Sequence, residues 1–347
     1  MYLMLLVCSI LSCLYLWWGI AVLPAERWQM AAAVPVARDA DGGWRGVNIT
    51  WYGILSANAY VAAAALFLAL AGSLGAPLTL ILATVAATLG VCVPASRLVA
   101  RIVEGKRHTF TVGGAVFVGT ITAPFIVSIM NRLLAAPGQS LPVMALLAAV
   151  ACGYALGEGF GRLACLSFGC CYGKRLDRIH PSLAKAFQGV AVSFAGETKK
   201  VSYAAGMAGI PLVPVQGMTA ILYTATALGG TALFLSGRYA ASFLLAMGVT
   251  QIWRTLSEFL RDDYRGENRF SAYQAMGLAA VAYGAVTAYY FRGSSPLLPD
   301  PSRLPGILWS PAVIIALQAV WVVILLYTGR STVTGSRILF HVHRDRV

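Results

Sequence analysis

Glu158, Arg162 and Cys165 are spaced so that a single helical face would carry all three side chains. They lie in the string GEGFGRLACLSFGCCYG, residues 157–173, which closes a long apolar run. Residues at positions i, i+4 and i+7 of an α-helix share one face. Charged side chains are costly at the end of a membrane helix, and where they occur they usually serve a function. This face is therefore the first candidate functional site.

A second polar series follows the same spacing in the string QIWRTLSEFLRDD. Gln251, Arg254, Glu258 and Arg261 are separated by three, four and three residues, which predicts one polar stripe on a helix. For Arg261, a snorkelling helix end with a salt bridge is an equally good interpretation. Arg254 lies deeper in its apolar run, which favours a functional role.

Two intramembrane arginines, each with a glutamate one turn away, suit the binding of an anion. Arg162 and Arg254 would remain charged and fork onto phosphate oxygens, and a lipid phosphate is the anion available at this depth. Glu158 and Glu258 would orient the guanidinium groups and reduce the cost of burying them. The alternative is a pair of purely structural buried ion pairs.

Three cysteines accompany the first stripe, and each has several possible roles. Cys165, Cys170 and Cys171 follow no familiar zinc spacing, and no partner residues complete a ligand set. A thiolate nucleophile beside Arg162 is a second possibility, and packing or a turn is the leading interpretation for each cysteine. The sequence therefore predicts no metal site and no cofactor.

Composition identifies the kind of elements that must position these residues. The chain has 347 residues, of which 59% are hydrophobic and 11% charged, whereas soluble domains carry about 25% charged residues. Its mean hydropathy of +0.73 predicts an all-α, polytopic membrane protein. About nine apolar runs are long enough to span a bilayer, and the first is expected to be an anchor rather than a cleaved signal peptide. The runs start near Met1, Trp51, Leu78, Thr109, Leu141, Val215, Tyr239, Ser271 and Ile307.

The net charge of +13 does not indicate nucleic-acid binding, because the basic residues lie in short loops beside apolar runs. The loop before Trp51 carries tryptophans typical of a membrane interface. The fourth run begins near Gly113 and Gly114, which suit either a substrate cleft or close helix packing. Residues 174–214 form the longest polar segment, expected to cap a site near the membrane surface.

Five stretches, which occur in the family's order along the chain, resemble the prolipoprotein diacylglyceryl transferase family. Gly161 to Gly173 is similar to the family signature Gly-Arg-Leu/Ile-Gly-Asn-Phe-x-Asn-x-Glu-x-x-Gly, in the Gly-Cys-Cys-Tyr-Gly form of divergent members. Trp51-Tyr52-Gly53 resembles the opening of the first core helix, and Pro214-Val215-Gln216 a later Pro-x-Gln. The remaining matches are RTLSEFLR from Arg254 to Arg261 and the start of the last core helix at 270–277.

The resemblance implies a function and a set of site residues. Members transfer a diacylglyceryl group from phosphatidylglycerol to a cysteine thiol of a lipoprotein precursor and release glycerol phosphate. By resemblance, Arg162 and Arg254 would hold the phosphate and Tyr52 would lie at the site. The catalytic residues expected are Arg162, Arg254, Tyr52 and Glu258, and the substrate-binding residues expected are Glu158, Arg261, Gln216, Gly113, Gly114, Cys165, Cys170 and Cys171.

One departure bears on the acceptor. Val118 stands where the family has a histidine often assigned an acid/base role, and Cys165 replaces a signature asparagine. If the motif-bearing helix ends share one face, 20 of the 26 lysines and arginines lie on that face and 4 on the opposite one. The positive-inside rule then predicts that the motif face is cytoplasmic, so the acceptor would not be an exported lipoprotein.

The expected organisation is therefore an extra helix and interfacial loop at 1–50, a family-like core at 51–291, and an extra helix with a basic tail at 292–347. The protein is expected in the bacterial cytoplasmic membrane, acting on a phospholipid and transferring its diacylglyceryl group to an unidentified acceptor. A lipid transporter or scramblase would use the same arginines without breaking a bond. A non-catalytic membrane subunit would use them only for packing.

Overall fold

Nine long helices form most of the computed structural model, which describes residues 2–104, 112–135, 140–263, 271–291 and 297–347. Each begins within a few residues of an apolar run, because a chain in lipid must satisfy its backbone hydrogen bonds internally. The helices are α1 (Tyr2–Val22), α2 (Trp51–Ser73), α3 (Leu78–Glu104), α4 (Val112–Leu134), α5 (Val143–Phe168), α8 (Val215–Leu235), α9 (Tyr239–Ser257), α10 (Ala272–Phe291) and α12 (Pro311–Thr328).

Seven of these helices are long and apolar enough to cross a membrane. The other two, α9 and α10, fall outside this set, and α9 carries the polar series that ends its apolar run. The chain is a multi-pass, all-α membrane protein, as predicted. About nine spans were expected, and membrane crossing by α9 and α10 remains a prediction.

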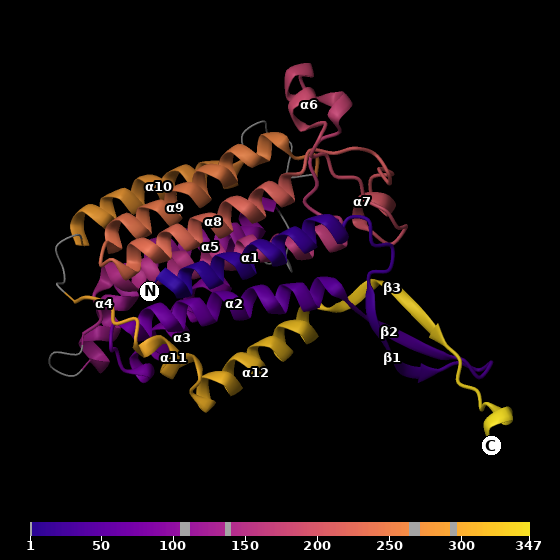
Figure 1. Ribbon diagram of the computed structural model, residues 1–347, viewed down its shortest axis with the longest axis horizontal. Helices are drawn as coiled ribbons and strands as arrows, with labels where there is room; N and C mark the ends of the chain where they lie inside the picture. The colour runs from indigo at the N-terminus through magenta and orange to yellow at the C-terminus, as the bar shows by residue number, and fades with distance from the viewer. Residues whose placement is uncertain (1, 105–111, 136–139, 264–270, 292–296) are drawn as a thin grey trace.

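Helix α5 lies at the centre of the bundle (Figure 1) and packs against α2, α8 and α9. Of its most apolar stretch, 67% is buried inside the protein, against 17% for α1 and 6% for α12. The side chains of its first three turns, such as Leu146, Ala148 and Cys152, belong to the larger hydrophobic core. The central helix is thus the one that ends in the signature string.

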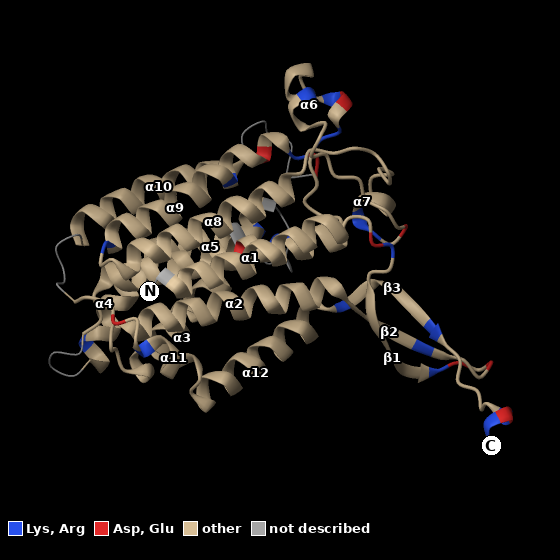
Figure 2. Ribbon diagram, in the orientation of Figure 1, with Lys and Arg blue, Asp and Glu red and all other residues tan. Residues whose placement is uncertain are grey.

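The helix ends that carry the motifs meet at one end of the bundle (Figure 1). A polar cap, residues 174–214, covers this end and includes η1 (Leu176–Arg178), α6 (Pro181–Phe187) and α7 (Lys200–Tyr203). Many of the lysines and arginines lie on the cap and on the neighbouring strands (Figure 2). The motif-bearing helix ends and many of the described basic residues therefore lie on one face (Figure 2), whereas Lys106, Arg107, Arg265 and Arg269 lie outside the described residues.

A three-stranded antiparallel sheet extends from the same end, and the sequence had not indicated it. It comprises β1 (Met30–Arg38), β2 (Trp44–Thr50) and β3 (Arg330–Ile338), with β2 in the middle. The sheet joins the expected interfacial loop to the expected basic tail, which are far apart in the sequence. Beyond the core, α11 (Arg303–Leu308) precedes α12, and η3 (Arg344–Arg346) follows the sheet.

Lys199 of the cap closes the C-terminal end of α5. Its side chain is fully buried, and its Nζ donates hydrogen bonds to the carbonyl oxygens of Ser167 and Leu23 at 2.7 and 2.9 Å. The Nε2 of Gln29 donates to the same Ser167 oxygen at 2.8 Å. A cation at a helix C-terminus satisfies free carbonyls and complements the helix dipole. Burial nevertheless lowers the pKa of Lys199 to about 8.

Lys199 should make the folded protein more stable as the pH rises from about 8 to 10.5, the ordinary value for lysine. In this window the unfolded chain holds the proton more tightly than the folded one, so stability rises with pH. The measurement is the thermal midpoint in detergent of the wild type and Lys199→Met at both ends of the window. The thermal midpoint of the wild type should rise relative to that of Lys199→Met as the pH increases from about 8 to 10.5. A constant or falling relative midpoint would contradict the conclusion that burial lowers the pKa of Lys199.

Candidate active site

The first predicted stripe lies on one helix. Glu158, Arg162 and Cys165 all belong to the last turns of α5. Arg162 Nη2 lies 2.6 Å from Glu158 Oε2, and the two side chains are 19% and 17% exposed. The Nε of Arg162 is buried and has no hydrogen-bond partner among the described residues. Glu158 therefore pairs with the guanidinium through Nη2, and its expected role in orienting Arg162 for an anion remains a prediction.

Arg254 lies on α9, and its guanidinium carbon is 6.0 Å from the centre of the Tyr273 ring on α10. This is within the range of a cation–π interaction. Arg162 and Arg254 both act electrostatically on the phenols of Tyr154 and Tyr223. Both arginines thus lie within electrostatic range of the same two tyrosines, Tyr154 on α5 and Tyr223 on α8. The sequence analysis did not single out Tyr154, Tyr223 and Tyr273. A polar phenol within an apolar run was the feature that could have identified them.

The prediction of a single helical stripe from Gln251 to Arg261 is wrong. Helix α9 ends at Ser257, and η2 (Glu258–Leu260) follows as a single 3₁₀ turn. Arg261 then adopts an extended conformation. The physical reason is a backbone pairing: Arg261 forms a β-bridge with Gly173, and Lys174 N donates to Leu260 O at 2.8 Å. The end of α9 is thereby joined to the signature turn.

Arg261 is also not a snorkelling helix end. Its Nε and Nη2 donate to the two carboxylate oxygens of Asp263 at 2.7 and 2.8 Å, and its side chain is 9% exposed. Such a fork is the strongest geometry for an arginine–carboxylate pair. Glu258 accepts a hydrogen bond from Ser271 Oγ. Its expected role in orienting Arg254 remains a prediction.

The start of α10 is held by a capping box. Ser271 Oγ accepts a hydrogen bond from Gln274 N at 3.2 Å, and Gln274 Oε1 accepts from Ser271 N at 2.8 Å. This Ser-x-x-Gln arrangement satisfies two backbone donors at once. The Nε2 of Gln274 also donates to Thr255 O of α9 at 3.0 Å. These contacts position Tyr273 beside Arg254.

The signature turn begins where α5 stops. Gly169 has a φ of 69°, a left-handed conformation that glycine adopts at little cost. The N–H groups of Gly169 and Cys170 both donate to Cys165 O, at 2.8 and 3.2 Å. Gln216 is 1% exposed, and its Nε2 donates to Cys170 O at 2.9 Å. The Oε1 of Gln216 is buried without a hydrogen-bond partner among the described residues.

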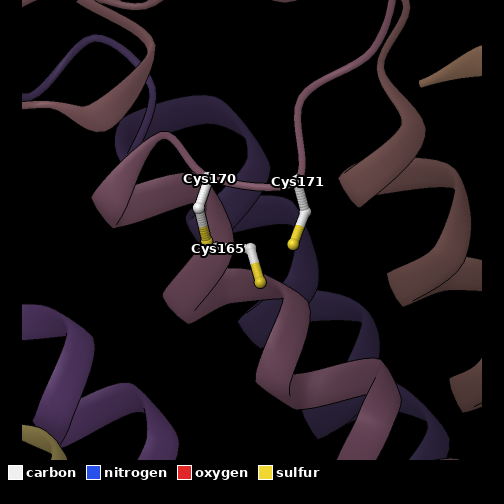
Figure 3. Close-up of side chains that lie close together, drawn as sticks. All are labelled: Cys165, Cys170 and Cys171. Carbon is white, nitrogen blue, oxygen red and sulfur yellow. The ribbon is translucent and has the colours of Figure 1, made fainter. Parts of the chain in front are cut away.

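The turn brings three sulfur atoms together (Figure 3). The Sγ atoms of Cys165, Cys170 and Cys171 all lie within 4.8 Å of one another. The phenol of Tyr52 lies within electrostatic range of all three cysteines. Its ring contacts the ring of Phe168 edge-on, with 5.6 Å between centroids. Tyr52 and the cysteines, predicted separately, thus belong to one region.

Gly113 and Gly114 lie in the first turn of α4, which packs against α3, α5 and α10. Their expected role in substrate binding remains a prediction, as does the alternative of close packing.

Gly173→Ala should destabilise the protein by about 1–3 kcal/mol, the usual cost of overpacking. A Cβ at this position would overlap the carbonyl oxygen of Val213 and lie 2.9 Å from the Val213 Cβ. The thermal midpoint in detergent measures the effect. Gly189→Ala is the matched control, because a Cβ at that cap position meets nothing within 4 Å. Equal midpoints for the two variants would show that the turn can move away from Val213.

Comparison with known proteins identifies the family of the chain. The family model for prolipoprotein diacylglyceryl transferase matches residues 44–290. A search of curated proteins returned no match. The matched range runs from the start of β2 to the end of α10 and contains both arginines and the signature turn. Because it covers most of the chain, this protein belongs to the prolipoprotein diacylglyceryl transferase family, whose members are membrane diacylglyceryl transferases.

Proposed function

We propose that this protein transfers the diacylglyceryl group of phosphatidylglycerol, or of a related anionic glycerophospholipid, to a nucleophilic acceptor and releases glycerol phosphate. The observation that carries the proposal is the state of Arg162. Its charge is balanced by Glu158 at 2.6 Å, yet its buried Nε has no partner among the described residues. An unfilled guanidinium donor in an apolar bundle suits a phosphate oxygen.

A second cation supports binding of the same group. Arg254 shares the neighbouring phenols Tyr154 and Tyr223 with Arg162 and approaches from another helix. Two guanidinium groups on different helices can contact different oxygens of one phosphate. Such a clamp fixes the headgroup while the acyl chains remain in the lipid.

The reaction follows from this placement. The acceptor's nucleophile attacks the glyceryl carbon that bears the phosphate, the carbon–oxygen bond breaks, and the phosphate oxygen keeps the electron pair. Negative charge grows on the leaving glycerol phosphate, and Arg162 and Arg254 stabilise it where it develops. Tyr52 is the hydrogen-bond or base candidate beside the cysteines, and Glu258 is the candidate to orient Arg254.

We infer a cytoplasmic orientation for the motif face in a bacterial inner membrane. The basic loops and strands at this face favour it by the positive-inside rule. Val118 in place of the family's histidine also removes the acid/base group that the family is expected to use on its acceptor. The acceptor proposed is therefore one other than an exported lipoprotein.

Phosphatidylglycerol labelled in its headgroup, supplied to the purified protein with native membrane extract, tests the proposal. Labelled glycerol phosphate should be released by the wild type and by Arg303→Ala. Arg303 is an exposed arginine that pairs with Asp300 and begins α11, which lies at the opposite end of the bundle (Figure 1). Arg162→Ala and Arg254→Ala should each release it at least about 10²-fold more slowly. Absence of release by folded wild type with several extracts would contradict the transferase and favour a lipid transporter, a scramblase or a non-catalytic subunit.

A further inference from the structure

The three sulfur atoms of the signature turn have the spacing of a metal site. The Sγ atoms of Cys165, Cys170 and Cys171 lie within 4.8 Å of one another. An ion at the centre of a triangle with sides of 4.8 Å lies about 2.8 Å from each corner, and zinc–thiolate bonds are about 2.3 Å long. A contraction of about half an ångström would therefore complete three bonds.

The backbone is bent so that neighbouring cysteines point to the same place. Consecutive side chains of an extended chain point to opposite sides. Cys171 has a φ of 56° and is the only non-glycine residue of the described chain with a positive φ. This conformation is unfavourable for a residue with a Cβ, and such strain is typical of functional sites. A cysteine that served only for packing would not require it.

Both sides of the turn are held in place. Cys165 is on the last turn of α5, and Gln216 holds the carbonyl of Cys170. After Cys171, Tyr172 O accepts a hydrogen bond from Asp262 N at 3.2 Å, next to the β-bridge between Gly173 and Arg261. The ligand positions are thus preorganised by contacts from α5, α8 and the end of α9.

The surrounding charge suits a thiolate cluster. The guanidinium groups of Arg162 and Arg261 both act electrostatically on Cys171. Three thiolates around a divalent cation leave one net negative charge, which these guanidinium groups would offset. The other four cysteines, Cys8, Cys13, Cys92 and Cys152, lie outside this cluster.

We propose that Cys165, Cys170 and Cys171 bind a zinc ion through three thiolates, and that the open fourth position takes the thiol of the acceptor. Zinc sites with three protein ligands keep a fourth position for substrate, and thiolates are preferred ligands of zinc. The second half of this proposal rests on the proposed transferase function; a thiol is the acceptor of the family's reaction, and the new element is the zinc ion that would bind it.

The zinc would activate the acceptor's thiol as a nucleophile, the task that the family's histidine is expected to perform as a base. A thiol bound to zinc would lose its proton to solvent. The thiolate sulfur then forms a bond to the glyceryl carbon as the carbon–oxygen bond breaks, and glycerol phosphate leaves with the electron pair. The product is a thioether, and the zinc undergoes no redox change.

Metal content of the full-length protein in detergent, purified with a phosphine reductant and then incubated with zinc sulfate and dialysed, tests the site. The wild type and Cys13→Ser should retain about one ion per chain. Cys171→Gly should retain none, and because glycine favours a positive φ this variant keeps the turn. With cobalt(II) in place of zinc, sulfur-to-metal charge-transfer bands should appear in the wild type and should be absent in Cys171→Gly. Equal zinc in Cys171→Gly, or a wild type without zinc and with a Cys165 disulfide by mass spectrometry, would overturn the proposal.

The fourth position is tested on the cobalt(II) protein with a short cysteine-containing peptide. Binding of its thiol should increase the charge-transfer intensity, and the same peptide with serine should not; no change with either would contradict an open thiol position. This outcome is distinguishable from failure of the transferase. Zinc binding without glycerol phosphate release would keep the metal site and contradict the transferase. Undiminished release of glycerol phosphate by Cys171→Gly would support the transferase and contradict a role for the metal site in the reaction.

Discussion

Arg162→Ala should lower the release of glycerol phosphate by about 10²- to 10³-fold, the loss typical when one donor to a developing oxyanion is removed. Arg162 is held by Glu158, and its buried Nε has no hydrogen-bond partner among the described residues. It therefore needs no rearrangement as the leaving group gains charge. Arg162→Lys should have an intermediate rate, because lysine keeps the charge but loses the planar fork.

The rates are compared at saturating phosphatidylglycerol in the headgroup-release assay, with Arg303→Ala as the matched control. A thermal midpoint for each variant separates loss of chemistry from loss of fold. If folded Arg162→Ala kept a rate within a few-fold of the wild type, the arginine would be a structural partner of Glu158 and not the phosphate ligand.

Glu158→Ala should destabilise the fold by about 3 kcal/mol, because it leaves the Arg162 guanidinium in the bundle without its counter-charge. The two side chains are only 17% and 19% exposed. The double variant Glu158→Met/Arg162→Met should recover most of this loss, since it removes both charges and fills similar volume. Reversible unfolding in mixed micelles gives the free energies of all three proteins.

The double variant should remain inactive even where its stability is restored. That combination would show that the pair is retained for function and not for stability. A double variant less stable than Glu158→Ala would instead show that the ion pair itself contributes net stability. That result would support the interpretation of the stripe as a purely structural ion pair.

Most of the helices could be predicted from the sequence, because lipid forces apolar runs into helices. Trp51, Val215 and Tyr239 begin helices at the residues expected. The face shared by Glu158, Arg162 and Cys165 was also predictable, since helical spacing determines it. Local chemistry of this kind needs no knowledge of distant contacts.

Features that depend on distant contacts could not be predicted. The strands at 30–38 and 330–338 each pair with residues 44–50, and neither shows a clear alternation of apolar and polar residues. Arg261 leaves the helical stripe because its backbone pairs with Gly173. The convergence of the three sulfur atoms depends on the positive φ of Cys171, which no residue pattern indicates. Lys199 belongs to a polar segment, and its burial against Ser167 depends on the folded cap.

The central claim, that the protein breaks the bond between glyceryl and phosphate and transfers the lipid part, is tested most directly by a donor with two labels. Phosphatidylglycerol carries one label in its headgroup and another in its acyl chains, and the purified protein is supplied with extract. Released glycerol phosphate should rise in equal amount with the acyl label on a new product. If zinc binds the acceptor's thiol, that product is a thioether. Free diacylglycerol in place of that product would indicate hydrolysis, and an intact donor with both labels would contradict catalysis altogether.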